Sequence, residues 1–275
     1  MPELPEVQTI VNDLLTAGLV GAEITGARVF WPRTISGMSP AAFGRRVKGR
    51  VVTGVWRRAK YIVVDLDGGL GLLIHLRMTG RLDLVPARQP RAKHEHVILE
   101  LGDQRHLRFH DTRKFGRFCL TAEPGKILDR LGPEPLSAAF TARRLADCLK
   151  ARRRMVKPLL LDQRMIAGLG NIYADEALWA AGIHPGRMAG TLLPAEIKAL
   201  HRAIRQVLAQ GVKNLGTTLG SGAGNFYSIA RHRGRNRDAL KVFRRDGLPC
   251  PRCAHPIRRI VVGQRGTHFC PVCQQ

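Results

Sequence analysis

The stretch Arg50–Leu76, RVVTGVWRRAKYIVVDLDGGLGLLIHL, contains three short apolar runs separated by turn-forming residues. The runs are Arg50–Trp56, Tyr61–Leu66 and Gly71–Leu76, and Asp67-Gly68-Gly69 separates the last two. Runs of this length that are rich in β-branched residues and bounded by glycine and aspartate are typical of β-strands. The stretch therefore predicts three consecutive strands.

The same pattern extends on both sides, from residue 23 to about residue 121. The further runs are Ala27–Phe30, Arg81–Val85, His96–Leu101, Gln104–His110 and Gly116–Leu120. Many short strands at this spacing favour a β-sandwich or a barrel. Ahead of them, apolar residues recur at helical spacing and predict a helix over residues 5–18, with Pro5 in its first turn and Gly18 at its end.

A stretch rich in glycine and proline over residues 123–136 indicates a domain boundary. Beyond it the apolar periodicity is helical, at about 141–150, 158–164, 171–182 and 194–210. We therefore expect an α+β multidomain protein, with an N-terminal β-sandwich and its leading helix over residues 1–133, a helical domain over 134–240 and a small cysteine-containing unit over 241–275. The run Arg231–Arg237, with arginine at every second position, predicts a disordered or extended basic arm.

The charge of the chain is strongly positive. Its 275 residues include 45 Lys and Arg against 21 Asp and Glu, a net charge of +24, and residues 141–275 alone carry 24 basic and 7 acidic side chains. Such an excess indicates a polyanionic partner, most simply nucleic acid, with an acidic membrane surface as the alternative. Neither a run of 18 apolar residues nor a signal-peptide pattern is present. We therefore expect a cytoplasmic protein without a membrane partner.

Four of the six cysteines lie in the last 26 residues, as Cys250-x2-Cys253 and, after sixteen intervening residues, Cys270-x2-Cys273. This is the spacing of a structural zinc site with four thiolates. Two disulfides are the alternative, and the missing export signal disfavours them. The segment between the pairs predicts a β-hairpin with arms 260–262 and 267–269, so that Arg265 lies at the tip, either as a solvated turn residue or as a contact to phosphate or a base.

The first residues, Met1-Pro2-Glu3-Leu4-Pro5-Glu6, allow two interpretations. If Met1 is removed, Pro2 presents a secondary amine that can attack an electrophilic carbon and form an iminium. Glu3 can then act as a general acid or base beside it. Prolines and glutamates are also an ordinary way to begin a helix, so composition alone leaves both interpretations open.

These residues and several later motifs resemble the formamidopyrimidine-DNA glycosylase family. The motifs are Met1-Pro2-Glu3-Leu4-Pro5-Glu6-Val7, Arg57-Arg58-Ala59-Lys60-Tyr61, His75-Leu76-Arg77-Met78-Thr79-Gly80, Lys93-His94-Glu95-His96, Leu131-Gly132-Pro133-Glu134-Pro135-Leu136, Gly168-Leu169-Gly170-Asn171-Ile172-Tyr173 and Gly263-Gln264-Arg265-Gly266-Thr267, followed by the second cysteine pair. They extend over the whole chain. The resemblance implies a monomeric, bifunctional DNA glycosylase/AP lyase of base excision repair. It would remove oxidised purines such as 8-oxoguanine and formamidopyrimidines from double-stranded DNA and contain one structural zinc ion.

The resemblance also implies a helix–two-turn–helix motif in the second domain and a role for each matching residue. Pro2 is the expected nucleophile at C1′ of the damaged nucleotide, and Glu3 is expected to protonate the ring oxygen of the sugar. Lys60 is expected to act around β-elimination and the neighbouring phosphate, and Arg265 in δ-elimination. The expected DNA contacts are His94, Arg113 and Arg152, with Lys157 and Asn171 on phosphates and with Met78, Arg113 and Phe115 filling the gap left by the extruded base. The expected zinc ligands are Cys250, Cys253, Cys270 and Cys273.

Two other functions stay open. One is an endonuclease VIII-like enzyme for oxidised pyrimidines, against which Leu4 argues, because that branch commonly has glycine there. The other is a non-catalytic zinc-ribbon DNA-binding protein, against which Pro2, Glu3 and Lys60 argue. The sequence departs from the family pattern at Thr112 and Lys114, where proline and arginine are common. It also departs over residues 220–241, where the loop that covers the extruded base is expected.

Overall fold

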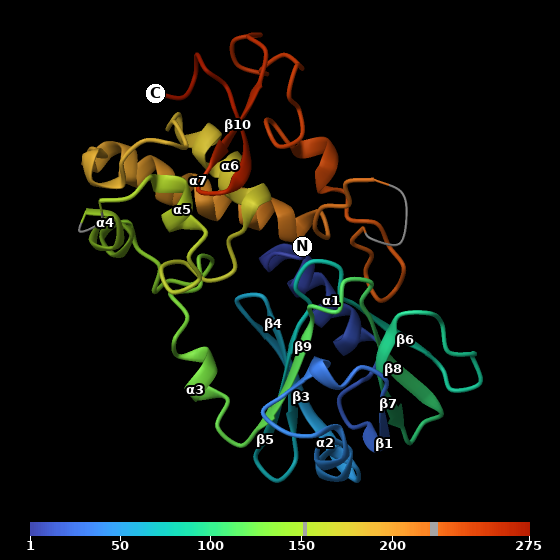
Figure 1. The fold of residues 1–275 in the computed structure, drawn as a ribbon. Helices are drawn as coiled ribbons and strands as arrows, with labels where there is room; N and C mark the ends of the chain where they lie inside the picture. Colours follow the sequence, from blue (N-terminus) through green and yellow to red (C-terminus); the bar gives the residue numbers. More distant parts are fainter. Residues whose placement is uncertain (151–152, 221–224) are drawn as a thin grey trace. The chain divides into compact units, whose positions relative to one another are not determined.

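The computed structural model describes residues 1–150, 153–220 and 225–275, and the chain divides into two compact units. The first unit comprises Met1–Asp129 and Leu215–Arg235, and the second comprises Arg130–Asn214 and Asn236–Gln275 (Figure 1). Arg152 lies outside the described residues. The division into three domains, with boundaries at residues 133 and 240, stays a prediction.

The described residues of the first unit contain nine strands in one hydrogen-bonded series, in the order β2-β9-β5-β4-β3-β1-β7-β8-β6. Their bounds are β1 Glu23–Val29, β2 Ile35–Ser36, β3 Arg50–Arg58, β4 Tyr61–Leu66, β5 Leu70–His75, β6 Arg81–Pro86, β7 Glu95–Leu101, β8 Arg105–His110 and β9 Arg117–Thr121. The pairs are antiparallel except for β2 with β9. All but β2 overlap strands predicted from the sequence, and β2 is only two residues long.

The series folds into two layers at the junction of β1 with β3. These strands pair at only two positions, whereas β4 and β5 pair at six. Apolar side chains from both halves then share one buried core. Across it, the rings of Phe109 on β8 and Phe118 on β9 meet edge to face, with 5.1 Å between their centroids. The predicted β-sandwich is therefore confirmed, and the barrel alternative is not observed.

Helix α1 (Leu4–Thr16) packs its apolar face into the same core and confirms the predicted leading helix. Gly18 follows it with φ +68°, and the N–H of Leu19 donates to the carbonyl of Leu14 at 3.1 Å, which is the usual way for a left-handed glycine to end a helix. The first unit also holds α2 (Pro40–Val47), the short helix α3 (Gly125–Leu128) and the 3₁₀ turn η1 (Pro32–Thr34). Helix α2 was not predicted, although Ser39 before Pro40 is an N-cap signal and its Oγ accepts the N–H of Ala42 at 3.2 Å.

The second unit consists of helices and one hairpin. Its described elements are α4 (Ala142–Lys150), α5 (Val156–Leu160), α6 (Asn171–Ala181), α7 (Pro194–Lys213), the 3₁₀ turns η2 (Ala189–Thr191) and η3 (Asn236–Ala239), and the strands β10 (Arg258–Val262) and β11 (Arg265–Phe269). Ile197, Leu200, Ile204 and Leu208 form the buried stripe of α7, and α7 packs against α6. These helices and the hairpin confirm the predicted helical domain with its C-terminal β-hairpin. None of the described helices is long and apolar enough to cross a membrane.

Helix α5 begins and ends earlier than the predicted helix over 158–164. Gln163 explains the early end, because its side chain organises the following turn rather than a helix face. Its Nε2 donates to the carbonyls of Leu161 and Leu169 at 3.0 and 2.8 Å, and its Oε1 accepts the N–H of Gly168 at 2.9 Å. The turn thus leads directly to the first residue of α6.

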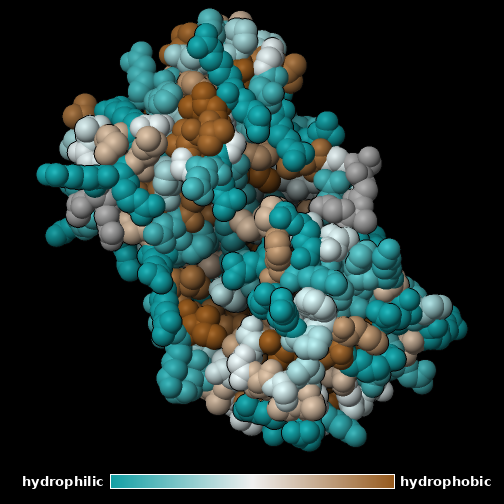
Figure 2. All heavy atoms as spheres, viewed as in Figure 1, coloured by the Kyte–Doolittle hydropathy of each residue, from teal (hydrophilic) through white to brown (hydrophobic). Residues whose placement is uncertain are grey.

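The basic run after residue 230 is not the extended arm that the sequence suggested. Arg231 forms an ion pair with the buried Asp83 of β6 at 3.0 Å, and the N–H of Ala230 donates to Asp13 of α1 at 3.0 Å. The N–H of Gly234 donates to Thr218 Oγ1 at 2.8 Å. Residues 236–239 then form η3. The run is therefore folded onto the first unit up to Arg235 and continues as a helical turn of the second. Figure 2 shows that hydrophilic side chains cover much of the visible face.

Candidate functional site

The first turn of the chain is buried and fixed by one carboxylate. Pro2 is buried, and Glu3, the N-cap of α1, is 2% exposed. The N–H of Glu3 donates to Glu6 Oε2 at 2.8 Å, and the N–H of Thr217 donates to Glu6 Oε1 at 2.7 Å. Gly216 lies so close that a Cβ there would be 2.9 Å from the Glu6 side chain. The N-terminal turn and residues 216–217 are therefore held together inside the first unit.

Lys60 lies in the tight turn between two strands on which α1 packs. Arg58 pairs with Tyr61, so Ala59 and Lys60 form the two-residue connection of β3 and β4, with Ala59 at φ +53°. Lys60 is 5% exposed. Helix α1 packs on both of these strands. The first unit thus buries a lysine in the strand pair on which the N-terminal helix rests.

His75 at the end of β5 supports the loop that carries Met78. Its Nδ1 accepts the N–H of Arg77 at 3.0 Å, and its ring meets Tyr61 edge to face at 4.8 Å. Burial, together with the positive charges of Arg77 and Lys60, lowers the pKa of His75 to about 3. The imidazole is therefore neutral at physiological pH, as an acceptor at Nδ1 must be.

Three of the predicted DNA-contacting side chains gather at the surface of the first unit. Met78 and Phe115 are 39% and 46% exposed. The guanidinium of Arg113 lies over the Phe115 ring, 4.7 Å from its centroid, and its Nη1 is 3.2 Å from the Met78 sulfur. Two apolar side chains and one cation thus form a compact exposed group, the types needed to fill a gap in a base stack. His94 lies on a neighbouring loop, at φ +70°.

The second unit brings Lys157, Asn171 and the β10–β11 hairpin together. Lys157 is fully buried, and its Nζ contacts Asp175 Oδ1 at 2.6 Å, Thr267 Oγ1 at 2.7 Å and the carbonyl of Gly266 at 3.2 Å. These contacts use the three donors of its ammonium inside the unit. In this structure Lys157 therefore holds the hairpin, and the phosphate contact expected for it stays a prediction.

Asn171 and Arg265 both lie next to Gly266 of the hairpin. The first residue of α6, Asn171, donates from Nδ2 to the carbonyl of Gly266 at 2.9 Å. Arg265 is exposed and pairs with Val262 as the first residue of β11, across a two-residue turn in which Gly263 and Gln264 have positive φ. The hairpin is thus tighter than predicted, because the arms extend to the turn, and Arg265 lies beside the tip instead of within it. The DNA roles of both residues stay predictions.

The four C-terminal cysteines form a cluster of the size that zinc requires. Their Sγ atoms all lie within 4.8 Å of one another, with 3.9 Å between Cys250 and Cys273 and 3.5 Å between Cys253 and Cys270. Tetrahedral Zn–S bonds of about 2.3 Å place sulfurs roughly 3.8 Å apart. Disulfide sulfurs lie about 2.05 Å apart, so the cluster fits one structural zinc ion and not two disulfides.

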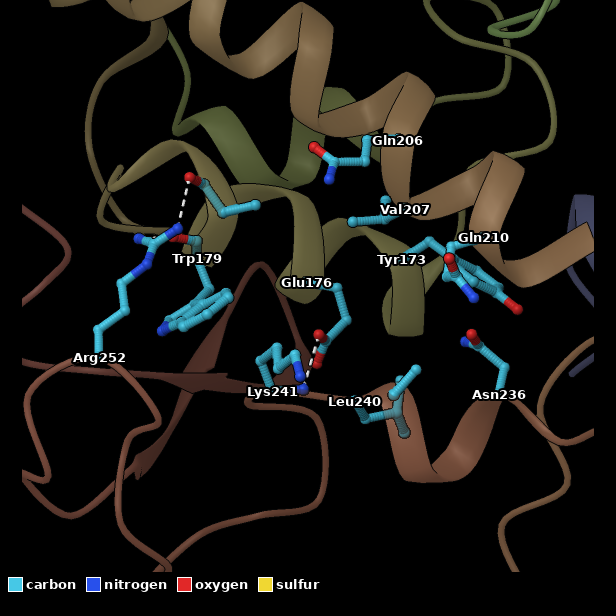
Figure 3. A pocket seen from close by; sticks show the side chains of 12 residues that line it. Tyr173, Glu176, Trp179, Gln206, Val207, Gln210, Asn236, Leu240, Lys241 and Arg252 are labelled. Carbon is cyan, nitrogen blue, oxygen red and sulfur yellow. Dashed lines mark hydrogen bonds between the residues drawn. The ribbon is translucent and has the colours of Figure 1, made fainter. Parts of the chain in front are cut away.

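Side chains of α6 anchor this cluster and the segment before it to the helical part of the unit. The indole N–H of Trp179 donates to Cys250 Sγ at 3.4 Å, and the guanidinium of Arg252 lies 3.9 Å from the Trp179 ring centroid. Glu176 accepts the N–H groups of residues 241, 242 and 243 at 2.8–2.9 Å. These side chains line a cavity of about 450 Å³ between α6, α7 and η3 (Figure 3).

Three buried carboxylates that hold chain segments together were not predicted from the sequence: Asp111 in the first unit, and Asp175 and Glu176 in the second. Asp175 is 1% exposed, and its Oδ2 accepts the N–H of His268 at 2.9 Å. A signal for the second pair was present, because two adjacent acidic residues inside the apolar run of α6 must be satisfied by partners if the helix is buried. Which segments they hold was not visible from the sequence.

We expect removal of zinc to unfold the hairpin while leaving the sandwich intact. Thiolate coordination provides about 10–16 kcal/mol in isolated zinc fingers, more than a unit this small obtains from apolar burial. Metal analysis should find one zinc per chain. Hydrogen exchange after chelation should show loss of protection over Arg258–Phe269 and unchanged protection in β4. A protected hairpin after verified loss of metal would contradict the assignment.

We expect His75 to make the first unit less stable in acid. Its pKa is lowered in the folded state, so protons bind the unfolded chain preferentially, and stability falls as the pH drops from 6.5 towards 3. His75→Asn keeps an acceptor for Arg77 without a titrating group. At pH 5 the wild type should have lost unfolding free energy relative to neutral pH, and in His75→Asn this loss should be smaller by roughly 1–2 kcal/mol. Urea unfolding measures both values. Exposed His232→Asn is the matched control, and identical pH profiles for the two variants would refute this role.

Comparison with known families covers three segments of the chain. Residues 1–118 match the formamidopyrimidine-DNA glycosylase N-terminal domain, residues 131–227 the H2TH domain of the same enzymes, and residues 247–275 the zinc finger found in FPG and IleRS. Curated relatives named formamidopyrimidine-DNA glycosylase include those of Roseiflexus sp., 49% identical, and Protochlamydia amoebophila, 45% identical. Each alignment covers 100% of both chains.

Solved structures agree with these matches. A Lactococcus lactis FPG mutant in complex with Fapy-dG-containing DNA has a TM-score of 0.92 at 34% identity, covering 100% of both chains. The MutM (Fpg) protein from Thermus thermophilus has a TM-score of 0.89 at 39% identity, covering 99% of this chain and 98% of the other. On sequence and structure together, the chain belongs to the formamidopyrimidine-DNA glycosylase family.

Proposed function

We propose that the protein excises oxidised purines, 8-oxoguanine and formamidopyrimidines, from double-stranded DNA and then cleaves the strand by β,δ-elimination. Family membership supports the glycosylase/AP lyase activity. The related structures with Fapy-dG DNA and with an abasic site support damaged duplex DNA as the partner. We further propose that the protein acts as a monomer in the cytoplasm, where a net charge of +24 would keep it on DNA.

The observation that carries the proposal is the buried first turn of the chain. A chain end is normally mobile, whereas Glu3 is 2% exposed and its N–H is fixed by Glu6. With Met1 removed, this arrangement presents a secondary amine beside a carboxyl group. The N-terminus of α1 disfavours an ammonium there, which favours the nucleophilic neutral amine.

In the proposed reaction the Pro2 nitrogen forms a bond to C1′ as the C1′–N9 bond breaks. The base leaves with the electron pair of that bond and takes up the proton that the amine loses. Glu3 donates a proton to the ring oxygen O4′, which opens the sugar and leaves an iminium. Loss of a C2′ proton then breaks the C3′–O3′ bond, and the phosphate on that oxygen leaves. Loss of a C4′ proton in a second elimination breaks the C5′–O5′ bond, and the phosphate on that oxygen leaves. Lys60 would act in the first elimination and Arg265 in the second. Zinc held by the four cysteines would fix the hairpin that carries Arg265.

C1′ is inaccessible inside a duplex, so the nucleotide must first leave the base stack at a cost of a few kcal/mol. The group of Met78, Arg113 and Phe115 is suited to compensate for this cost. Phe115 provides an aromatic surface for stacking, and Arg113 provides donors for the base that has lost its partner. The proposal thus assigns extrusion to this exposed group and base release to the buried N-terminal turn, which is a different part of the first unit.

The proposal is tested by incision of duplexes that contain 8-oxoguanine opposite cytosine, an oxidised pyrimidine, an abasic site or no damage. We expect cleavage of the purine lesion and of the abasic site. Glu3→Gln should lower the rate on 8-oxoguanine by about 10²-fold or more, the usual contribution of a general acid. Glu23→Gln, an exposed glutamate on β1, should cleave like the wild type.

Two outcomes would contradict the proposal. Cleavage confined to the pyrimidine lesion would indicate the endonuclease VIII-like specificity. Tight binding without cleavage of any duplex, by a chain that lacks Met1, would indicate a non-catalytic DNA-binding protein.

A further inference from the structure

Asp111 lies where three loops of the first unit meet, and it is fully buried. The loops are residues 76–80, which carry Met78, residues 93–95, which carry His94, and residues 111–116, which carry Arg113 and Phe115. All four carried residues are predicted DNA contacts. No family motif named above assigned a role to Asp111 itself.

The Asp111 side chain joins the first and third of these loops. Its Oδ1 accepts the hydroxyl of Thr79 and the N–H of Arg113, the latter at 3.1 Å. Its Oδ2 accepts the N–H of Gly116 at 2.8 Å. Thr79 Oγ1 also accepts the N–H of Arg113 at 3.3 Å. The carboxylate therefore connects the loop of Met78 to both ends of the segment that carries Phe115.

The backbone of Asp111 joins the remaining loop. Its N–H donates to the carbonyl of His94 at 3.0 Å, and its own carbonyl accepts from His96 Nε2 at 2.8 Å. Arg77, His94 and Lys114 have φ values of +56°, +70° and +60°. Left-handed conformations at non-glycine residues are unfavourable by about 1 kcal/mol or more. The loops therefore need external support to keep these conformations.

The Asp111 carboxylate can give this support only while its hydrogen-bond donors stay in place. Within the described part of the chain, Asp111 forms no ion pair with lysine or arginine, so hydrogen-bond donors alone stabilise its buried charge. A buried carboxylate that loses one such donor is strongly destabilised. The loops are also tightly packed, with no space for a side chain at either glycine. A Cβ on Gly116 would lie 2.2 Å from the Phe109 ring, and one on Gly80 would lie 2.3 Å from the Leu76 carbonyl oxygen.

We propose that Asp111, with Thr79 as its partner, is a positioning residue that holds Met78, His94, Arg113 and Phe115 in one fixed arrangement for insertion into duplex DNA. The inference rests on the proposed function. It predicts that the Thr79–Asp111 contact matters where a gap in a base stack must be filled, and matters little for chemistry at an accessible C1′.

The test compares Thr79→Val with Thr79→Ser. Valine removes the hydroxyl while keeping the shape of the side chain, whereas serine keeps the donor to Asp111. Thr25→Val is the matched control, because Thr25 is an exposed threonine of the same sandwich and its hydroxyl donates to the carbonyl of Glu100 at 3.3 Å. Asp111→Asn is a second variant, which removes the charge and part of the acceptor capacity.

Each variant is assayed on two substrates. On a duplex with 8-oxoguanine opposite cytosine, Thr79→Val should lower kcat/KM about ten-fold, the factor expected for loss of one hydrogen bond to a buried charge. Thr79→Ser and Thr25→Val should remain near the wild type, and Asp111→Asn should lose at least as much as Thr79→Val. On a single strand with a preformed abasic site, where no gap opens, Thr79→Val should differ from the wild type by less than about two-fold.

A fluorescent base analogue placed opposite the lesion provides a readout that does not depend on catalysis. Insertion by the wild type should change its stacking and hence its fluorescence on binding, and Thr79→Val should reduce that change. Wild-type behaviour of Thr79→Val on the duplex, or equal loss on both substrates, would overturn the inference alone. A wild-type protein that cleaves neither substrate would overturn the proposed function and the inference together.

Discussion

The first unit depends on holding the end of the chain in its interior. The first residues of a polypeptide have few neighbours in sequence and are normally disordered, yet the proposed chemistry takes place at residue 2. The buried carboxylate of Glu6 fixes these residues. It accepts the N–H of Glu3 through one oxygen and the N–H of Thr217 through the other. That second contact is one of several that tie residues 215–235, which follow helix α7 in sequence, to the first unit.

Buried carboxylates that accept hydrogen bonds from other segments occur in both units. In the described part of the chain, the buried acidic residues are Glu3, Glu6, Asp83, Glu95, Asp111, Asp175 and Glu176, whereas the only buried lysines and arginines are Lys60, Arg108 and Lys157. Glu6, Asp175 and Glu176 each accept a backbone N–H from a segment distant in sequence. Asp111 accepts the side-chain hydroxyl of the distant Thr79 instead. Because carboxylates serve as internal anchors, the solvent-facing charge is more positive than the composition alone implies. A surface of this kind favours contact with a polyanion.

Much of the fold was predictable, because the apolar periodicity of the strands and of α1 and α7 is set by burial on one face. The four cysteines and Gly18 were also predictable, since their chemistry acts locally. The burial of Lys157 was not predictable, because a lysine in a basic sequence resembles a surface residue. Only the fold shows that Asp175 and Thr267 bind its ammonium group. The prediction of an extended arm after residue 230 was wrong for the same reason, since the conformation of this run is fixed by distant partners such as Asp83. Long-range pairing of charged groups leaves no periodic signal in a sequence.

The central claim is that the secondary amine of Pro2 forms the covalent bond to DNA. Borohydride reduction during reaction with an 8-oxoguanine duplex converts an iminium into a stable protein–DNA adduct, and mass spectrometry of the digested adduct identifies the attached residue. We expect a single modified peptide that begins at Pro2, with Met1 absent and the DNA remnant on the proline nitrogen. An adduct on a lysine, such as Lys60, or no adduct from a protein with a free Pro2, would contradict the account.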